Sequence, residues 1–150
     1  MDATDELALS RQVCFALYAT SRAVTDLYRP ILDEFGLTYP QYLALLVLWE
    51  RPDDPLTVTQ LGAALHLDSG TLSPLLKRLE RAGLVTRRRA SRDERLVEIE
   101  LTGAGRALRQ RVEQVPRRIV RATGLTEGDL VALRGTLNQI TQLIHEQKEQ

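Results

Sequence analysis

Residues 57–84, with the sequence TVTQLGAALHLDSGTLSPLLKRLERAGL, contain two short helix-forming stretches separated by a tight turn. Thr57 and Gln60 have the spacing of a capping box, which predicts a first helix from Val58 to about Leu65. Asp68, only three residues after Leu65, then caps a second helix. Two short helices joined in this way are typical of a helix-turn-helix.

The second helix, which should run to Ala82 and end at Gly83, has two chemically different faces. Four leucines recur at helical spacing on one face: Leu72, Leu75, Leu76 and Leu79. The other face carries hydroxyl groups near the helix start and cations one or two turns later. Its candidate DNA-binding residues are Ser69, Thr71, Lys77 and Arg78. This order suits insertion of the helix into a DNA major groove.

Two expected strands, Leu84–Ala90 and Leu96–Leu101, follow the helix-turn-helix and flank a polar loop. A hairpin at this place predicts a wing, so the fold class is mainly α with a small β-hairpin, a winged helix-turn-helix. Asp93 is placed to hold Arg95 in a bidentate pair, and Arg95 to lie in or beside a minor groove. Alternatively, the two form an ordinary surface ion pair that contributes little.

Charge is distributed unevenly along a chain whose formal net charge is zero. Residues 1–76 carry 4 basic and 10 acidic side chains, whereas residues 77–95 carry 8 basic and 3 acidic ones. Such a concentrated positive segment is expected of a surface that binds phosphate groups. An arginine-rich solvated face, or a winged helix used for protein contact, remains the alternative.

Composition narrows the possible classes of protein. The chain of 150 residues has the length of a single domain, and one Cys with two His leaves no basis for a metal centre. Neither a dinucleotide-binding motif nor a phosphate loop is present, so no cofactor is expected. No apolar run has the length of a membrane span, and the acidic N-terminus lacks a signal-peptide pattern. We therefore expect a soluble cytoplasmic protein with a reduced thiol.

The remaining sequence is predicted to be helical. A long helix is expected over residues 7–35, and Thr38 with Gln41 forms another capping box. A helix from about Gly103 to Thr123, with Pro116 inside it, precedes a last helix from Thr126 to about Glu146. We expect dimerisation helices at about residues 5–35 and 103–148 around a DNA-binding lobe at about 38–101. Because the long helices are apolar, a two-fold homodimer on palindromic DNA is favoured over a monomer.

The order of elements, with Asp93-Glu94-Arg95 in the wing, resembles the MarR family of dimeric repressors. Four stretches resemble, more narrowly, the organic hydroperoxide resistance regulators of that family. They are Cys14-Phe15-Ala16-Leu17-Tyr18, Tyr28-Arg29-Pro30, Leu37–Leu45 and Leu67–Leu72. The resemblance runs from about residue 7 to 145 and implies a DNA-binding repressor rather than an enzyme.

Cys14 is the candidate redox sensor. A lone Cys on a helix is most often a small buried hydrophobe, but Tyr18 lies four residues on and shares its face. Tyr28 also points the same way, yet it lies about 21 Å along the helix from its own Cys14. Two crossing copies of the helix would bring Tyr28 and Tyr39 of one chain to Cys14 of the other. Phenol hydroxyls would there stabilise a thiolate.

The resemblance implies that Cys14 is the peroxide sensor and that Tyr28 and Tyr39 come from the other subunit. Organic hydroperoxide would oxidise the thiolate to sulfenic acid and release the DNA. Because the chain has one Cys, it resembles the one-cysteine class. In that class the sulfenate reacts with a small external thiol, cyclises onto a backbone nitrogen, or is oxidised further. One alternative is a repressor that responds to a small aromatic anion, with Cys14 inert. Another is a peroxidase-like enzyme, in which the winged helix would have no role.

Overall fold

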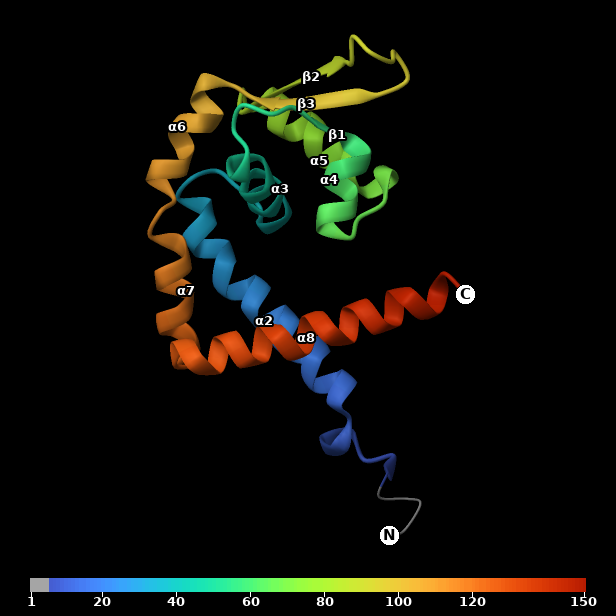
Figure 1. The fold of residues 1–150 in the computed structure, drawn as a ribbon. Coiled ribbons are helices and arrows are strands. Elements are labelled where there is room, and N and C mark those ends of the chain that lie inside the picture. Colours follow the sequence, from blue (N-terminus) through green and yellow to red (C-terminus); the bar gives the residue numbers. More distant parts are fainter. Residues whose placement is uncertain (1–5) are drawn as a thin grey trace. The chain divides into compact units, whose positions relative to one another are not determined.

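The computed structural model describes residues 6–150 in two compact units, one that ends at Val115 and one that begins at Pro116. Asp5, where the first expected dimerisation segment begins, lies outside the described residues. The first unit contains, in chain order (Figure 1), the 3-10 turn η1 (Leu9–Arg11), α2 (Val13–Asp33), α3 (Tyr39–Glu50), β1 (Leu56–Thr57), α4 (Val58–Leu65), α5 (Ser69–Arg81), β2 (Val85–Arg89), β3 (Val97–Leu101) and α6 (Gly103–Arg111). The helix α7 (Val115–Thr123) starts at the boundary, and α8 (Glu127–Lys148) completes the second unit.

The helices α4 and α5 form the predicted helix-turn-helix. The Thr57 hydroxyl accepts a hydrogen bond from Gln60 N at 3.1 Å, and Gln60 Oε1 accepts one from Thr57 N at 2.9 Å. Asp68 Oδ1 accepts from Thr71 N at 2.7 Å, which caps α5. Gly83 has a φ of +76°, a left-handed conformation that favours glycine and stops the helix.

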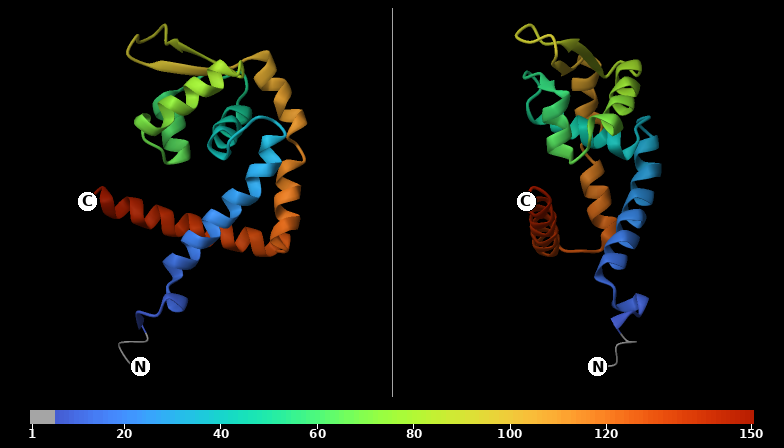
Figure 2. Two further views of the ribbon diagram at one scale, coloured as in Figure 1. Left: turned by 180° about the vertical axis from the view of Figure 1, so that it is seen from behind. Right: turned by 90° about the vertical axis from the view of Figure 1, so that its right-hand side faces the viewer.

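The sheet has three antiparallel strands in the order β1-β3-β2. Val85 pairs with Leu101 and Arg89 with Val97, so β2 and β3 form the predicted hairpin, which projects past the helices of this unit (Figures 1 and 2). The strand β1 was not predicted; it pairs Leu56 with Ile99. This short third strand attaches the base of the hairpin to the start of the helix-turn-helix.

The core of the first unit lies between α3, α5 and the sheet. All four leucines of the predicted apolar face of α5 are buried, as are Leu45 and Leu48 of α3 and Ile99 of β3. Trp49 of α3 is only 7% exposed and also belongs to this core. The buried face of α5 leaves its hydroxyl and cationic face free for solvent or a partner.

The long N-terminal helix starts later than predicted. It begins at Val13, after η1 and an extended Gln12, instead of near Leu7. The side-chain amide of Gln12 donates to the carbonyl oxygens of Glu6 at 2.6 Å and Ala8 at 3.3 Å, which stabilises this non-helical turn. Cys14 is consequently the second residue of α2.

The helix predicted over residues 103–123 is wrong as a single element. It is interrupted between Arg111 and Val115, and Val112 is the C-cap of α6. Pro116 has no N–H to donate to the carbonyl of Val112, and its ring would clash with that carbonyl in a continuous helix. Pro116 therefore takes the second position of a new helix, where its missing donor costs little.

In the second unit, α8 begins with the predicted cap. The Thr126 hydroxyl accepts from Asp129 N at 3.1 Å, and Asp129 Oδ2 accepts from Thr126 N at 3.2 Å. Several large apolar side chains of α8 are exposed, among them Val131, Leu133, Leu143 and Ile144. Across residues 6–150, none of the helices has both the length and the apolarity needed to cross a bilayer.

Candidate functional site

The exposed face of α5 carries the four residues predicted to bind DNA. Ser69 and Thr71 lie in its first turn, and Lys77 and Arg78 lie about two turns further along, all exposed. Across residues 6–150, neither of these two cations has an acidic partner. Hydrogen bonds from Thr71 lower the pKa of the capping Asp68, which keeps this carboxylate charged. The start of α5 is thereby held in one conformation.

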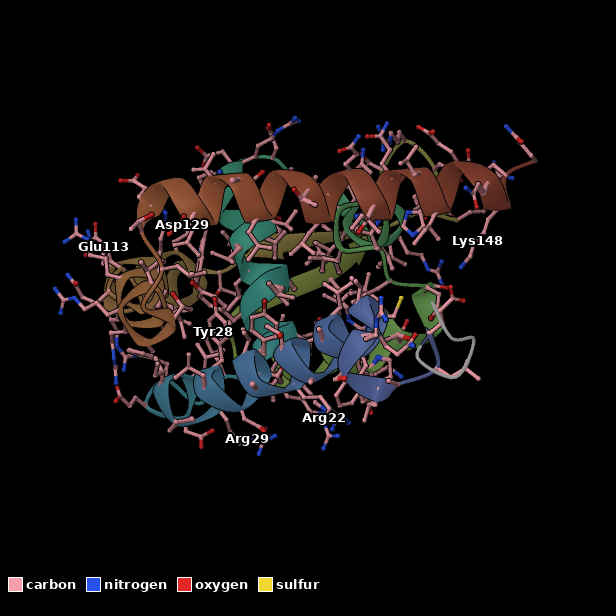
Figure 3. The ribbon with its side chains drawn as sticks, turned by 90° about the horizontal axis from the view of Figure 1, so that it is seen from below. Arg22, Tyr28, Arg29, Glu113, Asp129 and Lys148 are labelled. Atoms are coloured by element: carbon pink, nitrogen blue, oxygen red, sulfur yellow. The ribbon has the colours of Figure 1, made fainter. Side chains whose placement is uncertain are left out.

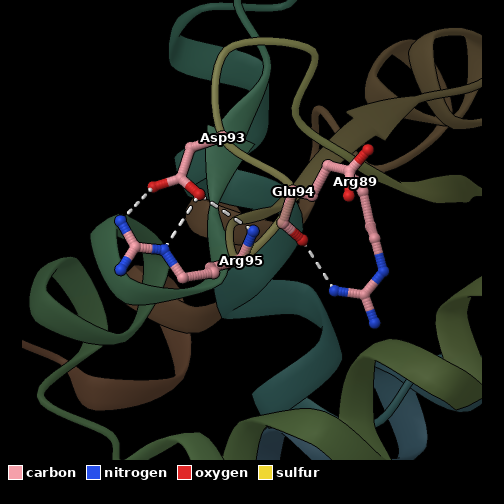
Figure 4. A network of polar contacts seen from close by, with 4 residues as sticks. All are labelled: Arg89, Asp93, Glu94 and Arg95. Atoms are coloured by element: carbon pink, nitrogen blue, oxygen red, sulfur yellow. Dashed lines mark hydrogen bonds and ion pairs between the residues drawn. The ribbon is translucent and has the colours of Figure 1, made fainter.

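The predicted pair in the wing forms with bidentate geometry (Figure 4). Arg95 donates from Nε to Asp93 Oδ1 and from Nη2 to Asp93 Oδ2, both at 3.1 Å, and its backbone N donates to Oδ1 at 3.0 Å. These hydrogen bonds lower the pKa of Asp93. The Arg95 side chain is nonetheless 90% exposed, so its outer edge is free to contact a ligand.

The neighbouring arginines of β2 are largely occupied by acidic groups or by the wing loop. Arg87 is clamped by Glu80 of α5, which accepts from the Arg87 backbone N at 3.0 Å and from its Nη2 at 3.2 Å. Arg88 lies 3.9 Å from Glu98 and 3.6 Å from Glu100 across the hairpin. Arg89 donates to the carbonyl oxygen of Glu94 at 2.7 Å (Figure 4). The cations left to face phosphate are therefore fewer than the sequence count indicates.

The glutamate Glu80 was not identified from the sequence as a functional residue. It lies on α5 between the buried leucine face and the exposed cationic face. By binding both the backbone and the guanidinium of Arg87, Glu80 links α5 to β2, the first strand of the wing. Its negative charge within an otherwise basic segment is the signal that points to such a role.

Cys14 is a free, exposed thiol in the first turn of α2. The N-cap residue, Gln12, makes no side-chain hydrogen bond to this turn. Tyr18 lies one turn further on and is 60% exposed, with the Cζ atom of Arg22 at 5.6 Å from its ring centroid. Within one chain, Cys14 has Tyr18 on its own helix face and no other site tyrosine nearby.

The other predicted tyrosines form a cluster further along the chain. The Tyr28 ring of α2 lies 4.4 Å from the Tyr39 ring of α3, centroid to centroid, and 5.9 Å from the ring of Tyr42. Figure 3 shows Tyr28 turned toward α3, whereas Arg22 and Arg29 point away on the outer side of α2. The structure thus brings Tyr28 and Tyr39 together, and α2, continuous from Val13 to Asp33, keeps both apart from Cys14 of the same chain.

Burial within this cluster, assisted by Tyr39 and Tyr42, raises the pKa of Tyr28 to about 12. Burial also raises the pKa of Tyr39. Both phenols therefore remain protonated at neutral pH and act as hydrogen-bond donors. Tyr42, only 2% exposed, is a further member that sequence reasoning missed, although its place three residues after Tyr39 puts it on a neighbouring helix position.

Comparison with known proteins identifies the family. A family model described as the transcriptional regulator SarA/Rot matches residues 26–112. The organic hydroperoxide resistance transcriptional regulator of Bacillus subtilis (strain 168) is 45% identical over 142 residues, which cover 95% of each chain.

Solved structures of DNA-binding proteins are also similar to this chain. Reduced AbfR bound to DNA has a TM-score of 0.77 at 35% identity and covers 95% of this chain and 99% of its own. Disulfide-formed AbfR has a TM-score of 0.60 at 35% identity, with 98% and 97% covered; the protein is from Staphylococcus epidermidis. The chain, with its single Cys, therefore belongs to the MarR family of transcriptional regulators, among the organic hydroperoxide resistance regulators, and not to a family of enzymes.

Proposed function

We propose that the chain is a homodimeric repressor whose release from DNA is triggered when organic hydroperoxide oxidises Cys14. The observation that carries the proposal is the separation of an exposed Cys14 from a half-buried pair of phenol donors, Tyr28 and Tyr39. A second copy of the chain is the source from which such donors reach the thiol. The similarity to a hydroperoxide resistance regulator and to AbfR, solved in reduced and disulfide forms, supports it.

The exposed apolar side chains support the homodimer. Around Cys14, the large side chains Val13, Phe15 and Leu17 are all exposed, with Val13 at 70%. Monomeric proteins rarely expose contiguous apolar surface of this kind, so a partner covers it. We assign dimerisation to the segments at about residues 5–35 and 103–148, which contain α2 and α6 to α8, and DNA contact to the lobe at about 38–101.

Contact with double-stranded, palindromic DNA is assigned to α5 and the wing. In a two-fold dimer the two recognition helices must lie about 34–36 Å apart to enter successive major grooves. Ser69, Thr71, Lys77 and Arg78 would meet bases and phosphates there, while Arg95, held by Asp93, would reach the adjacent minor groove. Lys77 and Arg78, which have no acidic partner among residues 6–150, and the 90% exposed side chain of Arg95 support this assignment.

The redox step converts the thiolate to a sulfenate. The Cys14 sulfur attacks the outer peroxide oxygen, so an S–O bond forms as the O–O bond breaks, and the alkoxide leaves as an alcohol after it takes up a proton. Sulfur loses two electrons and the hydroperoxide gains them. A small external thiol can then displace water to give a mixed disulfide, because the chain has no second Cys.

Phenol hydroxyls of Tyr28 and Tyr39 would stabilise the thiolate before this step, with Tyr18 of the same chain beside it. Among the described residues neither Tyr28 nor Tyr39 has a hydrogen-bond acceptor, so both donors are available. A bulky mixed disulfide at the dimer interface would then displace the packed helices. The recognition helices would lose their spacing and the DNA would be released.

The proposal is tested by measuring intact mass and DNA affinity together, before and after one equivalent of cumene hydroperoxide with a small thiol present. We expect the mass to rise at Cys14 as affinity falls, and Cys14→Ser to bind DNA but ignore the oxidant. Loss of affinity in the Ser variant would show that Cys14 is not the switch. Release by salicylate, with no response to oxidant, would favour a ligand-responsive repressor instead.

A further inference from the structure

The turn after the recognition helix is tied to α6 through one residue, Thr102. Its hydroxyl donates to the carbonyl oxygen of Gly83 at 2.6 Å and accepts from Gly105 N at 3.0 Å. Its backbone N donates to the carbonyl oxygen of Leu84 at 3.1 Å. The same side chain therefore caps α6 and holds the residue at which α5 ends.

The α6 side of this joint is fixed by close packing. The Trp49 indole N–H donates to the carbonyl oxygen of Gly105 at 2.9 Å from the buried end of α3. A Cβ atom at Gly105 would lie 2.1 Å from the carbonyl oxygen of Leu84, so the two backbones approach as closely as a glycine permits. The first turn of α6 is thus a rigid reference point for the end of α5.

The recognition helix, α5, is coupled to the wing by the bonds from Arg87 to Glu80. A backbone rotation at Gly83 would therefore displace the wing together with α5. The helix α5 has 13 residues and is about 20 Å long. A rotation of about 10° at Gly83 would move Ser69 by about 3.5 Å, close to the rise of one base pair.

We propose that the Thr102 hydroxyl is a positioning residue that sets the direction of α5 against α6, and so the half-site spacing that the dimer prefers. The inference rests on the DNA-binding function proposed above. Thr102 contacts neither the exposed face of α5 nor Cys14. Removing its hydroxyl should thus change only the distance and angle between the two DNA-binding surfaces, each made of α5 and the wing, in a dimer.

The test compares Thr102→Val, which removes the hydroxyl at nearly constant volume, with Thr102→Ser, which keeps it. Operators are first selected from random duplexes with the wild-type protein. Dissociation constants are then measured for the selected palindrome, for versions one base pair longer or shorter at the centre, and for a single half-site. Thermal unfolding of each variant is recorded alongside.

We expect Thr102→Val to bind the palindrome several-fold more weakly, because α5 is no longer held at one angle to α6, with half-site affinity unchanged and the preferred spacing altered. Thr102→Ser should behave as the wild type. Trp49→Phe, which removes only the indole donor, should shift the spacing preference as well and replaces the Val variant if that variant does not fold.

Two results would overturn the inference. One is an equal loss of affinity for the half-site and the palindrome, which would indicate a merely structural role. The other is an unchanged spacing preference in both Thr102→Val and Trp49→Phe. Failure of the wild-type protein to select any palindrome would instead contradict the proposed function, and the inference with it.

Discussion

At the scale of single residues, the wing pair shows how a carboxylate within a basic surface supports binding. Asp93 holds the guanidinium of Arg95 from one side and leaves its other edge exposed. Arg95→Ala should reduce affinity by about 1–3 kcal/mol for operators with an A·T tract at the wing position. Replacing that tract with G·C pairs should largely abolish the difference, as measured by fluorescence anisotropy.

The matched control is Arg92→Ala, which removes the same charge from the same loop. It should cause a small loss that is equal on both operators, because a phosphate contact carries no sequence information. Asp93→Asn keeps the size of the side chain and should produce a weaker form of the Arg95→Ala effect. If Arg95→Ala weakens both operators equally, Arg95 contacts phosphate only.

The tyrosine cluster leads to a second residue-scale prediction. Tyr28→Phe and Tyr39→Phe keep the ring packing and remove one donor each, so both should lower the thiolate share at neutral pH. A hydrogen bond to a charged group contributes about 1.5–3 kcal/mol, which corresponds to a slowing of oxidation of about tenfold or more. Part of this slowing is offset because a more basic thiolate is a better nucleophile.

Stopped-flow measurement of sulfenate formation against pH checks this, with Tyr42→Phe as the control. Tyr42 lies 5.9 Å from Tyr28 and supports it through its ring, so loss of its hydroxyl should leave the rate unchanged. DNA affinity of the reduced protein should be unaltered in all three variants. Equal slowing in all three would mean that packing, and not hydrogen bonding, controls the thiol.

At the scale of elements, the helix-turn-helix depends on a close approach at Gly62. A Cβ atom there would lie 2.7 Å from the carbonyl oxygen of Leu67, in the turn between α4 and α5. Gly62→Ala should lower the free energy of unfolding by about 1–3 kcal/mol, because the backbone must move to admit a methyl group. Chemical denaturation followed by circular dichroism measures this.

Gly103→Ala is the matched control, since a Cβ at that position in the first turn of α6 would meet no atom within 4 Å apart from its chain neighbours and its own helix backbone. It should be neutral or stabilise the fold by up to about 1 kcal/mol, because alanine has less conformational freedom to lose. The same Gly→Ala change should thus lower the free energy of unfolding at Gly62 but leave it unchanged or raise it at Gly103. A stabilised Gly62→Ala variant would show that the turn tolerates a wider separation.

The elements that sequence analysis predicted well are those with local determinants. The caps at Thr38, Thr57 and Asp68 form as expected, because their partners lie three residues away. The strand β1 was missed since its partner in β3 is about forty residues distant and only two residues pair. The break before Pro116 could have been predicted from the local sequence, because the proline ring would clash with the carbonyl of Val112 in a continuous helix.

At the scale of the whole molecule, the candidate redox site illustrates what one chain can and cannot specify. The spacing of Cys14, Tyr18 and Tyr28 along a helix face was predictable from periodicity, and α2 agrees with it. The stacking of Tyr28 on Tyr39 was not, since it depends on how α2 packs on α3. The meeting of these tyrosines with Cys14 depends on a second chain and stays a prediction.

A mixed dimer tests that prediction directly. One chain carries Cys14→Ser with intact tyrosines, and the other keeps Cys14 but carries Tyr28→Phe and Tyr39→Phe. If the donors come from the partner, the surviving thiol faces intact tyrosines and should react with cumene hydroperoxide at the wild-type rate. Two different affinity tags allow the mixed species to be purified, and mass spectrometry follows the oxidation of its single thiol.

The reciprocal dimer provides the control. There Cys14→Ser and both Tyr→Phe changes lie on one chain, so the surviving thiol of the other chain keeps its own tyrosines but faces two phenylalanines. It should react as slowly as the Tyr→Phe homodimer, because its own Tyr28 is about 21 Å away along α2. If the two mixed dimers exchange these rates, the tyrosines act within their own chain, and the crossed arrangement of two α2 helices is wrong.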